Sequence, residues 1–166
     1  MKPLADALII IDLQNGVCYN DTEIFNLSSL VTLINKRMLD YTSQGKNIII
    51  VQHTDEDLIQ GQSSWEVIPS LDKGKATHYI QKTHANSFYT TNLKELLEQE
   101  HINSIEICGA QTEYCVDATV KNAHALGYLI QMLRGGTTTY SNAFMSAENT
   151  VRFYENIWDN RFATFI

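Results

Sequence analysis

The sequence has few of the residues and runs that mark non-globular chains. Only two prolines and eight glycines occur among its 166 residues, which excludes collagen-like and low-complexity proteins. The apolar run near the N-terminus, ALIII, spans five residues, whereas a membrane-crossing helix needs roughly 18. No small-residue cleavage site follows this run, so we expect neither a signal peptide nor a membrane segment.

Cysteine and positive charge are also scarce. The three cysteines, Cys18, Cys108 and Cys115, form no CxxC motif and cannot all pair with one another, so we expect free thiols and a cytoplasmic protein. With 12 Lys and Arg against 19 Asp and Glu, the net charge is −7 and the pI is about 5.1. We therefore expect no nucleic-acid partner and no anionic membrane surface, because phosphate binding needs clustered basic residues.

The remaining composition is that of a folded domain. Hydrophobic residues make up 44% of the chain and charged residues 19%, which excludes a disordered tail and a coiled coil. A chain of this length buries about 70% of its unfolded surface, so it needs neither a disulfide nor a metal to hold its core together. We expect a single domain over 1–166.

Short apolar runs alternate with amphipathic segments along the whole chain. The apolar runs predict strands at 7–12, 47–53, 78–82, 104–109, 129–133 and 163–166. Helical spacing of apolar residues predicts helices from 27 to a stop at Gly45, and at 92–100, 113–126 and 143–158. We interpret the aperiodic stretch 54–77 as a long functional loop. This order predicts an α/β fold, a three-layer α/β/α (Rossmann-like) domain with a six-stranded, mainly parallel sheet.

Three reactive side chains stand at the carboxyl ends of predicted strands, where ligands of such folds bind. They are Asp12, Lys82 and Cys115. Each has a structural explanation as well: Asp12 can cap a turn, Lys82 can extend to solvent, and Cys115 can be a small buried hydrophobe. The start of a helix lowers the pKa of a thiol, which would activate Cys115. Together the three residues supply a base, a balancing charge and a nucleophile for acyl transfer.

Three segments carry a family resemblance: ALIIIDLQNG at 7–16, KTHANSFYTTNL at 82–93, and CGAQTEYCVDATVKNAHALGY at 108–128. Together, and in this order, they resemble the isochorismatase-like cysteine hydrolases. The third segment is the most specific, because its pattern of Gly, Thr, Cys and Ala covers a whole strand, turn and helix.

The resemblance implies a role for each matching residue. Asp12, Lys82 and Cys115 correspond to the catalytic triad of the family. The family also has a cis peptide bond before the nucleophile, which here lies between Ala110 and Gln111, and N–H groups near Gln111 and Cys115 would form the oxyanion hole.

The sequence gives weaker indications of the residues that bind substrate. Phe88 resembles a pocket-lining aromatic residue of the family, with an ordinary core phenylalanine as the alternative. Trp65 in the long loop can close over a flat substrate or pack on the surface of the domain. Gln14, in the first matching segment, completes the expected substrate-binding set.

One departure from the family concerns metal binding. Nicotinamidases of this superfamily carry an Asp-x-His metal motif after the second strand, whereas this chain reads QHTDED, with His53 and Asp55 in the reverse order. A lone histidine at a strand end is more often structural than a ligand. We therefore predict no required metal and no cofactor.

The intact Cys115 favours hydrolysis of the C–N bond of a small amide through a thioester. Isochorismatases proper cleave a vinyl ether and do not depend on a nucleophilic cysteine. Two alternatives therefore stay open: vinyl-ether cleavage with Asp12 as the acid, and a non-catalytic protein that binds a small molecule on the same fold. The resemblance also implies a homo-oligomer, a dimer or a tetramer.

Overall fold

A parallel sheet forms the centre of the molecule. The computed structural model describes residues 3–166, so residues 1–2 of the expected domain lie outside the description. Within the described part, the sheet has seven strands in the order β5-β4-β1-β6-β7-β9, with β8 paired beside β6, and all their pairings are parallel. The strands are β1 (Ala7–Ile11), β4 (Asn47–His53), β5 (His78–Lys82), β6 (Ser104–Ala110), β7 (Leu129–Met132), β8 (Thr137–Thr138) and β9 (Thr164–Phe165). The predicted α/β fold is confirmed, and β8 adds one short strand to the six that were expected.

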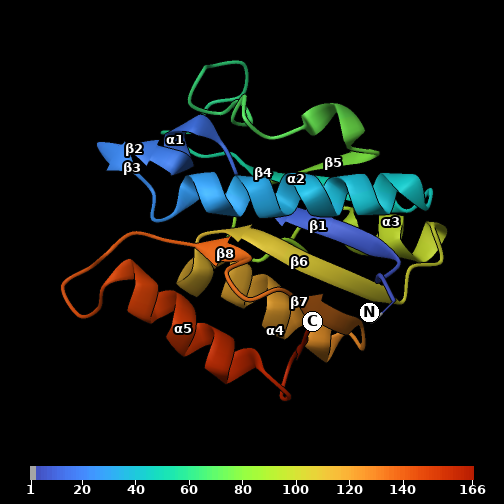
Figure 1. Ribbon diagram of the computed structural model, residues 1–166. Coiled ribbons are helices and arrows are strands. Elements are labelled where there is room, and N and C mark those ends of the chain that lie inside the picture. Colours follow the sequence, from blue (N-terminus) through green and yellow to red (C-terminus); the bar gives the residue numbers. More distant parts are fainter. Residues whose placement is uncertain (1–2) are drawn as a thin grey trace.

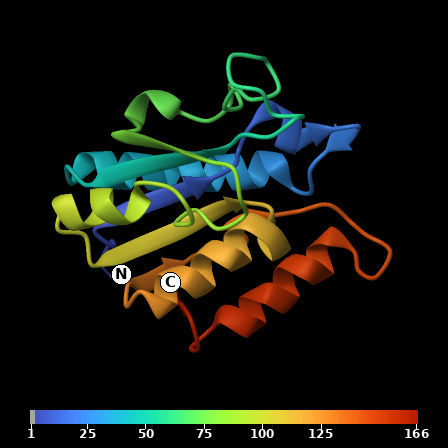
Figure 2. The ribbon, with the colours of Figure 1, turned by 180° about the vertical axis from the view of Figure 1, so that it is seen from behind.

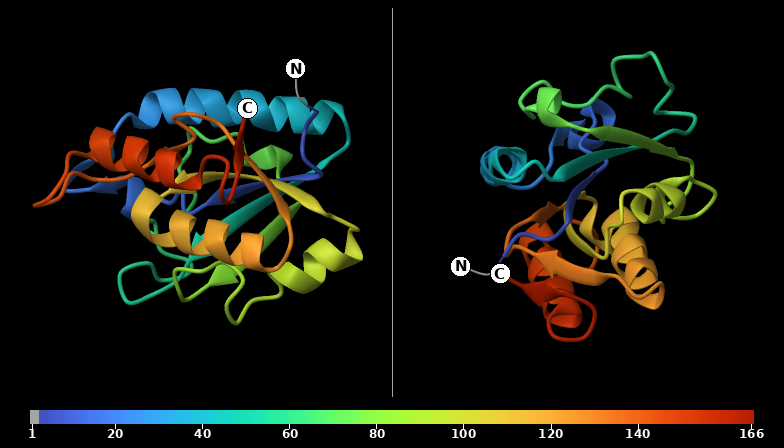
Figure 3. Two further views of the ribbon diagram at one scale, coloured as in Figure 1. Left: turned by 90° about the horizontal axis from the view of Figure 1, so that it is seen from below. Right: turned by 90° about the vertical axis from the view of Figure 1, so that its right-hand side faces the viewer.

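Helices cover both faces of the sheet. One face packs against α2 (Leu27–Ser43), which crosses in front of the sheet in Figure 1. The other face packs against α3 (Leu93–Gln99), α4 (Asp117–Ala125) and α5 (Ala147–Trp158), which come to the front in Figure 2. Figure 3 shows the resulting three layers from two further sides. No helix among residues 3–166 is long and apolar enough to cross a bilayer.

Short elements connect these layers. They are α1 (Asn15–Cys18), the antiparallel pair β2 (Tyr19–Asn20) and β3 (Thr22–Glu23), a 3-10 turn (Lys73–Lys75) and a π-helical turn (Thr112–Val116). The stretch 54–77 is a loop apart from its 3-10 turn, as expected. The π-helical turn falls in the helix predicted at 113–126. The other short elements were not predicted, because two to four residues are too few to show a hydrophobic period.

The central strand β1 shows why the apolar runs are continuous. All five of its residues are buried. Leu8 and Ile10 join the core beside α2, whereas Ala7, Ile9 and Ile11 join the core beside α3, α4 and α5. A strand that is covered on both faces has no solvent side and therefore needs no polar alternation.

One predicted helix start was wrong. The helix predicted at 143–158 begins only at Ala147, because Asn142 Oδ1 accepts the N–H groups of Phe144 and Met145 and turns the chain there. Ser146 then caps the helix by accepting the N–H of Asn149. The helix predicted at 113–126 is confirmed within one residue at each end, and its first turn, Thr112–Val116, is π-helical before the chain continues as α4.

The order of the strands creates one crevice. From β1 the chain moves outward to β4 and β5 and then returns to β6 on the other side of β1. The strand order therefore reverses between β1 and β6, and in open α/β sheets a ligand binds beyond the carboxyl ends of the strands at such a point. Asp12 follows β1 directly, and the turn that carries Cys115 follows β6.

Gly109 brings β6 close to β1 at this crevice. It pairs with Ile11 in the sheet register, and its φ angle of +121° lies where residues with a side chain are strained. A Cβ atom at this position would stand 2.2 Å from the carbonyl oxygen of Ile11. Only glycine fits here without a shift of one of the two strands.

We predict that Gly109→Ala lowers the free energy of unfolding by more than about 3 kcal/mol, because backbone strain and a steric clash act together. Urea unfolding followed by circular dichroism measures this change. Gly127→Ala is the matched control, since Gly127 also has a positive φ, +91°, but open space around its Cα. It should cost about 1–2 kcal/mol, and equal losses in the two variants would contradict the role of the close approach.

Candidate active site

Asp12 stands at the start of the crevice in a protected position. Its φ angle is +53°, which aspartate tolerates better than most residues, and its N–H donates to the carbonyl of Val51 on β4. Its side chain is 3% exposed. One carboxylate oxygen, Oδ2, accepts a hydrogen bond from Lys82 Nζ at 2.7 Å. The other, Oδ1, is buried and has no hydrogen-bond partner among the described residues.

Lys82 does not extend to solvent; its ammonium group is buried in the crevice. The side chain is 0% exposed and lies on the face of β5 that packs toward α3 and α4. Nζ lies 2.7 Å from Asp12 Oδ2, 3.1 Å from His53 Nδ1 and 3.3 Å from Cys115 Sγ. An ammonium group has three N–H donors and no acceptor, so these contacts use its full hydrogen-bonding capacity.

Cys115 is the most accessible of the three cysteines in the described chain. Cys18 and Cys108 are buried, whereas Cys115 is partly exposed in the turn after β6. Burial, together with the nearby charge of Asp12, raises the pKa of Cys115 to about 12, against the opposing effect of Lys82. The expectation that its position at the start of a helix lowers the pKa was therefore wrong for the free protein: the thiol is neutral at pH 7.

The pKa of Asp12 is shifted in the direction that suits a base. Burial raises the pKa of Asp12, while the charge and hydrogen bond of Lys82 lower it in part. A carboxylate with a raised pKa accepts a proton more readily than an exposed aspartate. The unpaired Oδ1 is the atom that can take this proton, because Oδ2 is bound to Lys82.

A small cavity opens beside these groups. Its volume is about 150 Å³, below the range of about 300–1,000 Å³ of typical ligand pockets. The residues that line it come from the end of β4, the long loop, α1, the turn after β6 and the position directly after β1: Asp12, Val17, His53, Asp55, Leu58, Gln111, Tyr114 and Cys115. The peptide bond between Ala110 and Gln111, at the mouth of this turn, is cis.

The donor set could in principle hold a metal ion. Ligand atoms of Asp12, His53 and Cys115 lie within 4.8 Å of one another. The ammonium of Lys82, however, is hydrogen-bonded to all three of these residues. A metal cation held by these atoms would lie beside the positive charge of Lys82, which the same three residues already bind, so this donor set fits an ammonium better than a metal. That no metal is required stays a prediction.

The three residues expected to bind substrate are not among the residues that line this cavity. Gln14 is fully buried, and its side-chain amide bonds the backbone: Oε1 accepts the N–H of His53, and Nε2 donates to the carbonyls of His53 and Trp65. Gln14 therefore holds the chain in place and does not present its amide to a ligand. Phe88 stacks on Tyr128, with ring centroids 5.9 Å apart, and packs against the core.

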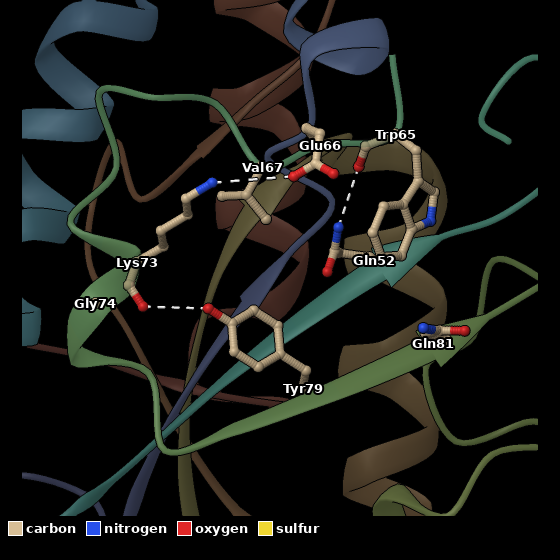
Figure 4. A pocket seen from close by; sticks show the side chains of 8 residues that line it. All are labelled: Gln52, Trp65, Glu66, Val67, Lys73, Gly74, Tyr79 and Gln81. Carbon is tan, nitrogen blue, oxygen red and sulfur yellow. Dashed lines mark hydrogen bonds and ion pairs between the residues drawn. The ribbon is translucent and has the colours of Figure 1, made fainter. Parts of the chain in front are cut away.

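The ring of Trp65 faces a different cavity. Its Nε1–H donates to Thr54 Oγ1, and its backbone carbonyl accepts from Gln52 Nε2. Figure 4 shows this second cavity, of about 470 Å³, between the long loop and the edge strand β5, where Tyr79 stands opposite Trp65. Trp65 reaches the crevice through its carbonyl group, which Gln14 binds, and not through its ring.

Other residues of the cavity were not predicted. Val17, Leu58 and Tyr114 line it, yet Val17 lies in the four-residue helix α1 and Leu58 in the aperiodic loop. Neither position has a periodic pattern that points to a site. His53 and Asp55 follow a predicted strand, but the sequence does not show which side chains they contact.

Fold and site together define an α/β protein with a thiol, a carboxylate and a buried ammonium group at a topological switch point. The family model for the isochorismatase domain matches residues 6–158. The chain therefore belongs to the isochorismatase family, and it is a hydrolase of that family.

Individual relatives agree with this assignment. A crystal structure of an isochorismatase family protein superposes with a TM-score of 0.93 at 38% identity, with 96% of each chain covered. The isochorismatase family protein YddQ of Bacillus subtilis is 28% identical over 145 residues, which cover 82% of this chain and 79% of that protein. The nicotinamidase of Saccharomyces cerevisiae is 34% identical over 89 residues, 52% of this chain and 41% of that protein.

We predict opposite effects of two substitutions on the reactivity of Cys115 toward iodoacetamide. Asp12→Asn removes the negative charge that raises the pKa of this thiol, so alkylation at pH 8 should be at least about tenfold faster than in the unchanged protein. Lys82→Met removes the positive charge and should slow alkylation. Peptide mass spectrometry locates the label, with Cys18 and Cys108 in the same sample as internal references. Slower alkylation of Cys115 in Asp12→Asn would contradict the electrostatic description.

Proposed function

We propose that this hydrolase cleaves the C–N bond of a small amide through a thioester on Cys115, with Asp12 as base and acid and Lys82 as the charge that holds both in place. The observation that carries the proposal is the ammonium of Lys82, which donates to Asp12 Oδ2 and to Cys115 Sγ at once. This arrangement leaves Asp12 Oδ1 unpaired in the crevice where the thiol proton must go. The nicotinamidase relative supports an amide as the substrate class.

The first step is a proton transfer from Cys115 to Asp12. In the free protein the thiol keeps its proton, because burial and Asp12 raise its pKa to about 12. Transfer of this proton to Oδ1 neutralises Asp12 and leaves a thiolate beside the ammonium of Lys82. The ammonium of Lys82 stabilises the Asp12 carboxylate before the transfer and the Cys115 thiolate after it, and it contacts both groups from the same position.

The thiolate then attacks the carbonyl carbon of the amide. We assign the developing oxyanion to backbone N–H groups at Gln111 and Cys115, next to the Ala110–Gln111 bond. Protonated Asp12 gives its proton to the nitrogen, the C–N bond breaks, and ammonia or an amine leaves. Asp12 next takes a proton from a water molecule, whose oxygen attacks the thioester. The acid is released, and the proton returns to Cys115.

The size of the cavity bears on the substrate. A volume of about 150 Å³ accepts the reacting amide group with a few neighbouring atoms. Asp55 and His53 contribute polar groups to the lining of the cavity, and Val17 and Leu58 contribute apolar groups. The partner of this site is therefore a small molecule with a compact, partly polar group around the amide.

Vinyl-ether hydrolysis is the second candidate, and one observation favours it. Burial raises the pKa of Asp12, which also suits a general acid that protonates an enol ether. In that reaction Cys115 would take no part. Replacement of Cys115 therefore separates the two functions.

The cellular setting and the assembly belong to the same proposal. Free Cys18, Cys108 and Cys115 support a reducing compartment, and we assign the protein to the cytoplasm. We expect one hydrolase domain over 1–166 that assembles as a dimer or tetramer. The side chain of Phe144, 93% exposed on the loop before α5, offers an apolar contact for such assembly.

We predict that a panel of small amides, with nicotinamide among them, includes at least one from which the protein releases ammonia. Cys115→Ala should abolish this release, and Asp12→Asn should lower it by about a thousandfold or more, because both residues act in the same bond-breaking sequence. Cys108→Ala is the matched control, since Cys108 is buried in β6 and does not line the cavity. Full turnover by Cys115→Ala would contradict the thioester mechanism and favour the ether reaction.

A further inference from the structure

His53 contacts the triad without being part of it. It is the last residue of β4, and its side chain is 18% exposed. Its Nδ1 atom lies 3.1 Å from Lys82 Nζ, and its Nε2 atom lies 3.2 Å from Asp55 Oδ2. The ring thus stands between a buried ammonium group and a carboxylate.

The chemistry of these partners determines which ring nitrogen carries the proton. The ammonium of Lys82 can only donate, so Nδ1 of His53 must accept. A neutral imidazole has one N–H group, which is then on Nε2 and donates to Asp55 Oδ2. Burial and the positive charge of Lys82 lower the pKa of His53, which favours this neutral form near pH 7.

The main chain of His53 is held as firmly as its ring. Gln14 Oε1 accepts the N–H of His53 at 2.7 Å, and Gln14 Nε2 donates to the carbonyl of His53 at 2.9 Å. The same Nε2 donates to the carbonyl of Trp65, which also accepts from Gln52, as the dashed line in Figure 4 shows. These bonds join β4, the long loop and the segment between β1 and α1 next to His53.

Asp55 is fixed by a turn of its own. Its Oδ1 accepts the N–H groups of Asp57 and Leu58, at 2.9 and 2.8 Å. Its Oδ2 therefore stays directed at His53 Nε2 in the absence of any substrate. Asp55, in the sequence QHTDED, thus fixes the ring of His53 so that Nδ1 can accept the hydrogen bond from Lys82.

We propose that His53 is a positioning residue that accepts the third hydrogen of the Lys82 ammonium and so directs the other two at Asp12 and Cys115. The proposal rests on the proposed function, because it assigns to Lys82 the task of holding those two groups. Rotation about the Cε–Nζ bond would otherwise let the ammonium favour the carboxylate over the thiol. An acceptor on the third side restricts this rotation, and a buried N–H without an acceptor would be destabilising.

Three substitutions of His53 separate the accepting atom from the rest of the side chain. Asparagine places an oxygen near the position of Nδ1, glutamine places its amide near the position of Nε2, and leucine fills space without any acceptor. We expect His53→Leu and His53→Gln to lower kcat for the amide by about 10- to 100-fold, with a smaller change in KM, because the reacting groups lose their alignment. His53→Asn should recover most of kcat. Urea unfolding of all three variants checks that they fold.

A second measurement needs no substrate. Nitrogen NMR of protein labelled at lysine reports how fast the ammonium hydrogens of Lys82 exchange with water. We expect slow exchange in the unchanged protein and in His53→Asn, and exchange faster by about tenfold or more in His53→Leu and His53→Gln, because one hydrogen loses its acceptor.

The outcomes distinguish this proposal from the proposed function. If no amide is turned over by the unchanged protein, the proposed function fails, and the exchange measurement alone decides the role of His53. Unchanged exchange and unchanged kcat in folded His53→Leu would overturn the positioning role. Equal loss of kcat in His53→Asn and His53→Leu would overturn it as well, because it would show that the shape of the ring matters and the acceptor does not.

Discussion

The buried ion pair between Lys82 and Asp12 is the interaction on which the site depends. Both side chains are almost fully removed from water, which is unfavourable for each charge alone, and their 2.7 Å contact offsets part of that cost. Loss of either partner would leave an unpaired charge in the crevice. The pair also joins the end of β1 to the end of β5, two strands that are not neighbours, across the intervening β4.

The rest of the crevice follows from this pair. Lys82 reaches Cys115 and His53 with its two remaining hydrogens, so the ends of β1, β4 and β5 and the turn after β6 converge on one ammonium group. Asp12 keeps one free oxygen, and Cys115 keeps its proton because burial and Asp12 disfavour the thiolate. In the free protein the Cys115 thiol and the Asp12 carboxylate therefore stand side by side without proton transfer. When the proton does move from Cys115 to Asp12, the ammonium of Lys82 is already in place to balance the charge of the thiolate.

The strands could be predicted from the sequence, because a buried parallel strand is a continuous apolar run. The convergence of Asp12, Lys82 and Cys115 could be predicted as well, because each follows or ends a strand at the same edge of the sheet. Side-chain directions could not. Lys82 ends an edge strand, where lysine usually reaches solvent, and only the packing of β5 against its neighbours turns it inward. Gln14, Trp65 and Phe88 were expected at the substrate, yet Gln14 binds backbone, Trp65 lines a second cavity, and Phe88 packs against the core. The pKa of Cys115 was misjudged because burial, which the sequence does not display, outweighs the position at a helix start.

The central claim is that the hydrolysed acyl group is carried by Cys115. Rapid acid quenching of the protein with an amide that it turns over, followed by peptide mass spectrometry, tests this most directly. The account predicts that the peptide containing Cys115 gains the mass of the acyl group before the acid accumulates, and that the peptides containing Cys18 and Cys108 stay unmodified. When ammonia is released before the acid, the acyl group must still be bound to the protein. Cys115 that stays unmodified at every time point under that condition would contradict the thioester.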